Sequence, residues 1–171
     1  MSLVIGAQIA EDPQAVRFAA GAALKLAQCH LAIPARLGAD ELGVLLVGLL
    51  RLFQSDFPAL AVDPDAIAQQ TQKLRRLIPT GLLNELKPFA LAVNAATFDH
   101  RALSRGLATA GLRAGVVTAG SVGVALRVAM ARAQVADLPT AMTDPVLREL
   151  VQFAIGEDHA ALAGLGLVTG L

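Results

Sequence analysis

The sequence predicts an all-α fold, with about eight helices in a single compact domain over residues 1–171. Apolar residues recur at steps of three and four in segment after segment, which is typical of helices with one buried face. Sustained alternation with a period of two is missing beyond the first few residues. Apolar residues make up 55% of the chain and aromatic residues only 4%, so we expect a core of Leu, Val and Ala, which favours closely packed helices.

The first helix is expected over residues 12–31. Asp12 suits the N-cap and Pro13 the first helical position, where its missing N–H costs nothing. Pro34 ends the helix, because the residue before a proline is pushed out of the α region. Its expected buried residues are Val16, Ala19, Ala20, Ala23, Leu24 and Ala27. The small residues 19–23 leave one side nearly bare, which either lets another backbone approach closely or marks a place where larger functional groups are absent.

The next two helices flank the clearest loop of the sequence, residues 55–64. The second helix begins at Gly38–Glu41, and its expected buried residues are Leu42, Leu45, Leu46, Leu49, Leu50 and Phe53. Asp63 caps the third helix, with Pro64 at its first position. The polar residues 69–73 in its middle are expected to face water.

Two prolines divide the segment that follows. Pro79 ends the third helix, and a short helix is predicted over residues 80–86. Pro88 then starts another helix, over residues 89–97, because proline is tolerated at a helix start. Its expected buried residues are Phe89, Leu91, Ala92 and Ala95.

A long helix begins at the cap residue Asp99 and runs to about Thr118. Its expected buried residues are Leu103, Leu107, Ala110, Ala114 and Val117. Gly120 suits the C-terminal end, where a left-handed residue is often needed. Ser121 caps the next helix, predicted over residues 122–135.

The last part of the chain repeats the same start signal at Asp144 and Pro145. Residues 138–140 are read as a loop before it. The expected buried residues of the new helix are Leu147, Leu150, Val151 and Ala154. A short helix over residues 158–163 closes the fold.

The two ends are expected to carry little structure of their own. Residues 1–6 include the apolar run Leu3-Val4-Ile5, which predicts one short strand or an extension that needs partners from elsewhere. Residues 164–171 are expected to be a frayed tail. The start lacks a basic segment followed by a long apolar one, so it is not a signal peptide. We expect the chain to be a fragment of a longer protein.

Composition excludes several function classes. Basic and acidic residues balance at 14 each, so no basic field exists to gather nucleic acid. The longest apolar run, residues 43–50, is far below the ~20 residues that span a bilayer, so we predict no transmembrane segment. A single cysteine, Cys29, excludes an internal disulfide and favours a reducing, cytoplasmic location.

Ligating and nucleophilic side chains are scattered. His30, His100 and His159 lie in different segments, whereas a zinc site needs three or four converging ligands. Cys29 has no base at helical spacing, so we expect a buried structural cysteine. On this reading there is no metal site and no cofactor.

Two weaker patterns also have ordinary explanations. Asp56, Asp63 and Asp65 surround the loop, but their spacing matches no calcium loop, and two of them suit a helix start. Residues 120–123 superficially look like a glycine-rich phosphate loop. No strand precedes them and no lysine follows, so an inter-helix turn is predicted.

Four stretches, residues 3–13, 17–26, 105–117 and 120–127, together resemble one family, the HtpX-like zinc metallopeptidases. Residues 17–26 resemble its helix Arg-Phe-x-x-Gly-His-Glu-x-x-His, and residues 3–13 resemble the strand and short helix before it. Residues 105–117 resemble Arg-x-x-Glu-x-x-x-Asp-Arg-Ala-Gly-Leu-Leu, and residues 120–127 the continuation Asp-x-x-x-Ala-Leu-Arg.

The resemblance places apolar residues at every position of the family's site. Its two zinc histidines fall on Ala22 and Leu26, and its general-base glutamate falls on Ala23. Its third ligand falls on Ala108 and its aspartate on Leu112. The resemblance thus implies a degenerate fold without zinc or catalysis, because such a peptidase needs three ligands and a carboxylate. It predicts that the two helices pack together, with Ala22, Leu26 and Ala108 close and dry.

The function expected first is that of a non-catalytic helical interaction or scaffold domain, a pseudo-enzyme. Its partner is a protein, another domain of the same chain, or a second copy. Two alternatives stay open: a helical domain that binds a small apolar ligand, and an enzyme with an unrecognised site. For an enzyme, Asp56, His30 and His100 are the only polar candidates.

Overall fold

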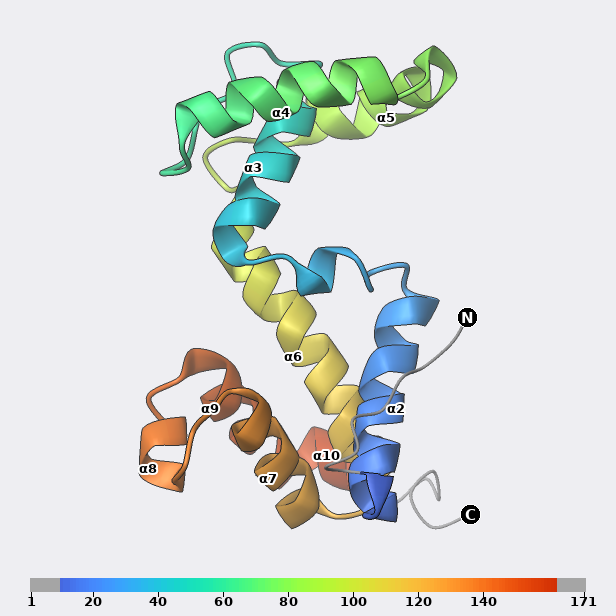
Figure 1. The fold of residues 1–171 in the computed structure, drawn as a ribbon, viewed down its shortest axis with the longest axis vertical. Helices are drawn as coiled ribbons and strands as arrows, with labels where there is room; N and C mark the ends of the chain where they lie inside the picture. Colours follow the sequence, from blue (N-terminus) through green and yellow to red (C-terminus); the bar gives the residue numbers. More distant parts are fainter. Residues whose placement is uncertain (1–9, 163–171) are drawn as a thin grey trace. The chain divides into compact units, whose positions relative to one another are not determined.

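The computed structural model describes residues 10–162, and this part of the chain is all α-helical. It contains α2 (Pro13–Gln28), the 3-10 helix η1 (Pro34–Arg36), α3 (Ala39–Leu50), α4 (Pro64–Leu77), α5 (Thr80–Ala92), α6 (His100–Ala119), α7 (Val122–Arg132), α8 (Leu138–Ala141), α9 (Pro145–Ile155) and α10 (Glu157–Leu162) (Figure 1). The predicted fold class is confirmed. The strand expected in residues 1–6 and the tail 164–171 lie outside the described residues. No helix between residues 10 and 162 is long and apolar enough to cross a membrane.

The chain contacts divide it into two compact units. The first unit comprises Met1–Ala35 and Arg105–Leu171, and the second unit comprises Arg36–Ser104. Each unit has its own cluster of buried apolar residues. A single domain over residues 1–171 stays a prediction, because compact units are defined by contacts and domains by independent folding.

Helix α2 begins as predicted, since the backbone N–H groups of Gln14 and Ala15 donate to Asp12 Oδ1 at 2.9 and 3.1 Å. The predicted buried face is wrong. The buried residues are Ala15, Phe18, Gly21 and Ala22, whereas Leu24 is 52% exposed. Phe18 decides the orientation, because this fully buried ring is the largest side chain that the helix gives to the first core.

Helices α2 and α6 approach each other closely in the first unit. A Cβ placed on Gly115 would lie 2.9 Å from the backbone oxygen of Phe18, and one on Gly111 would lie 3.5 Å from that of Ala22. Thr118 Oγ1 also donates to the backbone oxygen of Arg17 at 3.0 Å. The close backbone approach expected from the small residues of α2 is therefore confirmed.

Helices α7 and α9 complete the first core. Ser121 caps α7, and Asp144 Oδ1 accepts from the backbone N–H groups of Val146 and Leu147 at 2.8 and 2.9 Å. The expected inward residues Leu147, Leu150 and Ala154 are buried. An ion pair joins α6 to α9, with Arg113 Nη2 at 2.6 Å from Glu149 Oε1.

The loop predicted at residues 138–140 is wrong, because these residues form the short helix α8. Asp137 caps it by accepting from the backbone N–H of Thr140 at 2.8 Å, and this hydrogen bond holds the pKa of the Asp137 carboxyl below its usual value. Pro139 lies in the first turn, where no N–H is needed. A helix of four residues is too short to show apolar periodicity.

In the second unit, α3 packs against α4. Gly48 permits this contact, since a Cβ there would lie 3.3 Å from Cβ of Gln70 and Thr71 Oγ1 donates to its oxygen at 3.2 Å. The second core consists of Val47, Leu50, Phe57, Val62, Ile67 and Ala90. Asp63 caps α4 by accepting from the N–H of Asp65.

The loop between α3 and α4 supplies part of this core, which the sequence pattern did not indicate. Phe57 is only 2% exposed, and its ring meets that of Phe98 edge to face at 5.9 Å between centroids. Its backbone oxygen accepts from Arg51 Nε at 2.8 Å. Phe53, predicted to lie on the α3 face, follows the end of the helix and packs against the same core.

The two predicted helices around Pro88 are in fact one helix, α5, and this prediction is wrong. The proline removes one backbone hydrogen bond, while its ring lies on the exposed side. The buried residue of the continuous helix is Ala90, and Phe89 is 73% exposed instead of buried. Leu91 and Ala92, also expected inside, are exposed.

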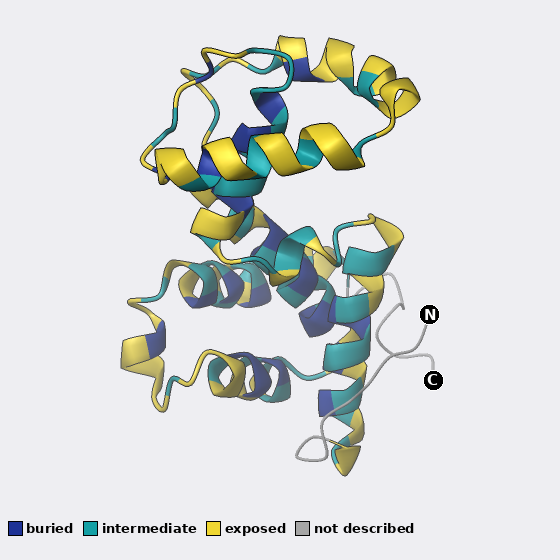
Figure 2. Cartoon of the chain, turned by 45° about the horizontal axis from the view of Figure 1, so that its top comes forward, coloured by how far each residue is buried: buried dark blue, intermediate teal, exposed yellow. Residues whose placement is uncertain are grey.

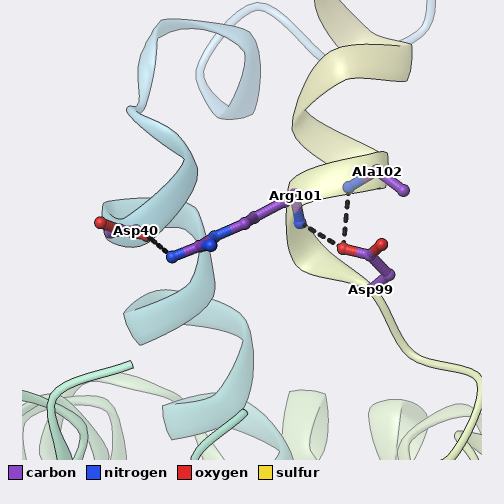
Figure 3. A network of polar contacts seen from close by, with 4 residues as sticks. All are labelled: Asp40, Asp99, Arg101 and Ala102. Atoms are coloured by element: carbon purple, nitrogen blue, oxygen red, sulfur yellow. Dashed lines mark hydrogen bonds and ion pairs between the residues drawn. The ribbon is translucent and has the colours of Figure 1, made fainter. Parts of the chain in front are cut away.

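Helix α6 begins at the expected cap. Arg101 and Ala102 donate their backbone N–H groups to Asp99 Oδ1, both at 2.9 Å (Figure 3). Arg101 Nη2 also pairs with Asp40 Oδ1 of α3 at 3.3 Å, an exposed contact of small energetic value. Leu103 was expected to be buried and is exposed, because this part of α6 precedes the helix–helix contact with α2.

Candidate functional site

Four of the five positions singled out by the resemblance line one cavity in the first unit. Ala22 and Leu26 come from α2, and Ala108 and Leu112 from α6. Helices α7 and α9 supply the opposite wall, and the cavity measures about 260 Å³. Ala23, the fifth position, is half-buried and lies outside this lining.

The convergence follows from the small residues of both helices. A Cβ on Gly111 would lie 3.1 Å from Leu26 Cδ1, so glycine lets this leucine lie against α6. The predicted packing of the two helices, with Ala22, Leu26 and Ala108 close together, is confirmed. That the space between them is dry stays a prediction.

Charged groups are few in this cavity. Its described lining contains only Arg132, at the end of α7, and Asp144, whose Oδ1 caps α9. The other lining residues are alanine, glycine, leucine and valine. The arrangement can therefore accommodate an apolar group of modest size.

Two of the three polar candidates for an enzyme, His30 and Asp56, are exposed. His30 follows α2, is exposed, and has a left-handed backbone with φ of 56°. Asp56 is exposed in the loop of the second unit. His159 meets the Phe153 ring edge to face at 5.8 Å. Between residues 10 and 162 no group of three His, Cys, Asp or Glu side chains is placed to hold a metal.

The expectation of a buried structural cysteine is wrong. Cys29 is exposed, because α2 ends at Gln28 and the thiol lies beyond its packed face. The helix is three residues shorter than the predicted 12–31 range at this end, since His30 takes a left-handed conformation there.

His100 is the histidine that sequence reasoning undervalued. It is only 4% exposed, and its Nε2 has no hydrogen-bond partner. A Cβ on Gly43 would lie 2.7 Å from His100 Cδ2 and 2.9 Å from Val62 Cγ2. Gly43 lies inside the otherwise leucine-rich α3, and a glycine at such a position indicates that a bulky group packs against the helix there.

A polar cluster in the first unit was also missed. The Arg113 guanidinium pairs with Glu149 and stacks over the Phe153 ring at 5.3 Å from its centroid. Glu149 Oε2 accepts from Thr109 Oγ1 at 3.3 Å, so one carboxylate joins two residues of α6 to α9. A cavity of about 430 Å³ adjoins these groups and includes Glu157 and Asp158. Residues from separate helices form this cluster, so no local motif marks it.

The second unit carries large apolar side chains on its surface. Leu82 and Phe89 of α5 are both exposed, and because they are seven residues apart they lie on one face of the helix. Leu91 is exposed on another face, and Leu77 ends α4. Figure 2 shows how much of α4 and α5 is exposed.

Compared with known proteins, the chain matches no family model, no curated protein and no solved structure. The resemblance to HtpX-like metallopeptidases therefore stays a prediction. So does the absence of catalysis that it implies.

Proposed function

We propose that the chain is a non-catalytic helical interaction domain that pairs with a second copy of itself through α5. The observation that carries this proposal is the exposed apolar pair Leu82 and Phe89 on one face of α5. Exposed apolar groups of this size that lie together are typical of protein contact surfaces.

The spacing of the pair suits a symmetric contact. Seven residues correspond to about 10.5 Å along a helix, so two antiparallel copies of α5 would each set Leu82 against Phe89 of the other. The formal net charge of +0 removes long-range repulsion between copies. A contact built mainly on one helix is small, so we expect a weak dimer, with a Kd of about 10–100 μM.

Replacing Phe89 with serine is expected to raise the dimer Kd by about tenfold or more, because burial of a phenylalanine is worth about 1.5–3 kcal/mol. Sedimentation equilibrium over a range of concentrations measures this change. Leu91→Ser is the matched control, since it removes an exposed apolar side chain from another face of the same helix. A wild-type chain that stays monomeric, or equal weakening in both variants, contradicts the proposal.

A second candidate function, binding of a small apolar ligand, is favoured by the cavity of about 260 Å³ between α2, α6, α7 and α9. Buried cavities of about 150 Å³ already hold benzene when their walls are apolar. The alanine and leucine walls described above are apolar in the same way, and this cavity is in addition partly open to solvent.

Benzene is the simplest probe of that cavity. We expect it to shift the NMR amide signals of Ala108, Gly111 and Leu112 in a saturable manner. Ala108→Leu should abolish saturation by filling the space, whereas Ala102→Leu, on the exposed start of α6, should leave it unchanged. Shifts that rise linearly, or that survive in Ala108→Leu, contradict this function.

A further inference from the structure

An open surface cavity of the second unit has a different character from the apolar one, and four of its six lining residues are exposed. It measures about 280 Å³, and its described lining is Arg51, Ser55, Ala68, Thr71, Gln72 and Arg75. Two guanidinium groups thus share one cavity with two hydroxyls and a carboxamide, and no carboxylate belongs to the described lining. The Thr71 hydroxyl already donates to backbone oxygens, so Ser55 offers the free one. Such a set of donors selects for an anion.

Arg51 is held in place by the fold. It follows the last residue of α3, and its Nε donates to the backbone oxygen of the buried Phe57 at 2.8 Å. This bond uses one of five N–H donors and leaves both terminal nitrogens for a ligand. A side chain already fixed by the protein loses less rotamer entropy when it binds.

Arg75 supplies the second charge from α4. Among residues 10–162, none of the ion pairs involves Arg75. Thr71 and Gln72 precede it by four and three residues, so the three side chains lie on neighbouring positions of one helix face. Both arginines lie near helix C-termini, where positive charge is favoured. The preference for positive charge at helix ends explains why each position holds an arginine. It does not explain why the two arginines line the same cavity.

We propose that this cavity binds the phosphate group of a small phosphomonoester. Two guanidinium groups match the double negative charge of a phosphate monoester, and Ser55 and Gln72 add neutral donors for its remaining oxygens. The cavity is larger than a phosphate ion, so it has room for part of the esterified group. Asp56 is the nearest carboxylate in sequence; it is exposed and lies outside the lining. This inference is independent of the two functions proposed above.

The test uses the full chain and phenyl phosphate in an NMR amide titration, with ionic strength held constant by chloride. We expect saturable shifts confined to residues 51–55 and 68–75, with a Kd of about 0.1–10 mM for so small a ligand. Arg75→Gln should raise the Kd by about tenfold or more, since a charge-assisted hydrogen bond is lost. Arg76→Gln, which removes the adjacent exposed arginine outside the lining, should change it less than about twofold.

Four outcomes decide the proposal. Equal weakening by Arg75→Gln and Arg76→Gln means attraction to a charged surface and overturns it, as do shifts that never saturate. Binding of acetate as tightly as inorganic phosphate overturns the assignment to a doubly charged oxyanion. Selective loss in Arg75→Gln, with inorganic phosphate competing against phenyl phosphate, supports it.

Discussion

Replacing Gly115 with alanine is expected to lower the free energy of unfolding by about 3 kcal/mol, which is large for one methyl group. The new Cβ would lie 2.7 Å from Phe18 Cδ2, 2.8 Å from Phe18 Cε2 and 2.9 Å from the Phe18 backbone oxygen. The ring cannot swing away because it is fully buried in the first core. The overlap between the new Cβ and Phe18 can therefore be relieved only if α2 and α6 move apart, which loosens the packing around them.

The matched control lies on the same helix. A Cβ on Gly106 would have no neighbouring atom within 4 Å, so Gly106→Ala is expected to raise stability by about 0.5–1 kcal/mol through helix propensity alone. Urea unfolding measures both changes, with equal slopes indicating that the unfolding reaction is the same. Two variants that shift the midpoint in the same direction would contradict the close contact between α2 and α6.

Replacing Phe57 with alanine is expected to lower the free energy of unfolding by about 3–5 kcal/mol, as for other fully buried phenylalanines. The change leaves a cavity beside Phe98 and removes an edge-to-face ring contact, although Phe57 lies in a loop. Phe89→Ala, at a protein concentration well below the proposed dimer Kd, is the control, because that ring is exposed in the monomer and its loss there should cost under about 0.5 kcal/mol. Thermal unfolding of the two variants measures the difference, and equal costs would show that the loop is not part of the core.

Helix starts could be predicted from the sequence because capping is a local interaction. Asp12, Asp63 and Asp144 each cap the helix that was assigned to them, through hydrogen bonds that span two or three residues. A proline after each aspartate makes the signal stronger still. The same rule misled at Pro88, which lies inside a continuous helix; the buried Ala90 follows it, and the Ala90 oxygen accepts from Gln54 Nε2.

Buried faces were harder to predict than helix starts. In a segment made mostly of alanine, as in α2, several faces are equally apolar, and the single large residue Phe18 decides which one is packed. Phe57 shows the same dependence on tertiary contacts, because nothing within its loop indicates burial. Alanine-rich periodicity predicts a helix well and its rotation poorly.

One of the candidate sites could be predicted from the sequence and the others could not. The meeting of Ala22, Leu26 and Ala108 was predicted, because it depends on two helices and their small residues. The anion cavity was not, since Arg51 and Arg75 belong to different helices and each has a local explanation at its helix end. Gly43, which leaves room for the His100 ring, is likewise distant from it in sequence.

The order of the two units along the chain has a consequence for folding kinetics. Contacts of the second unit close within residues 36–104, whereas the first unit joins segments on either side of that range. The bond from Thr118 to Arg17, for example, spans 101 positions. Because closing a longer loop costs more conformational entropy, we expect contacts of the second unit to form early and those of the first unit late. During synthesis, α2 must therefore wait for α6 while the whole intervening segment is made.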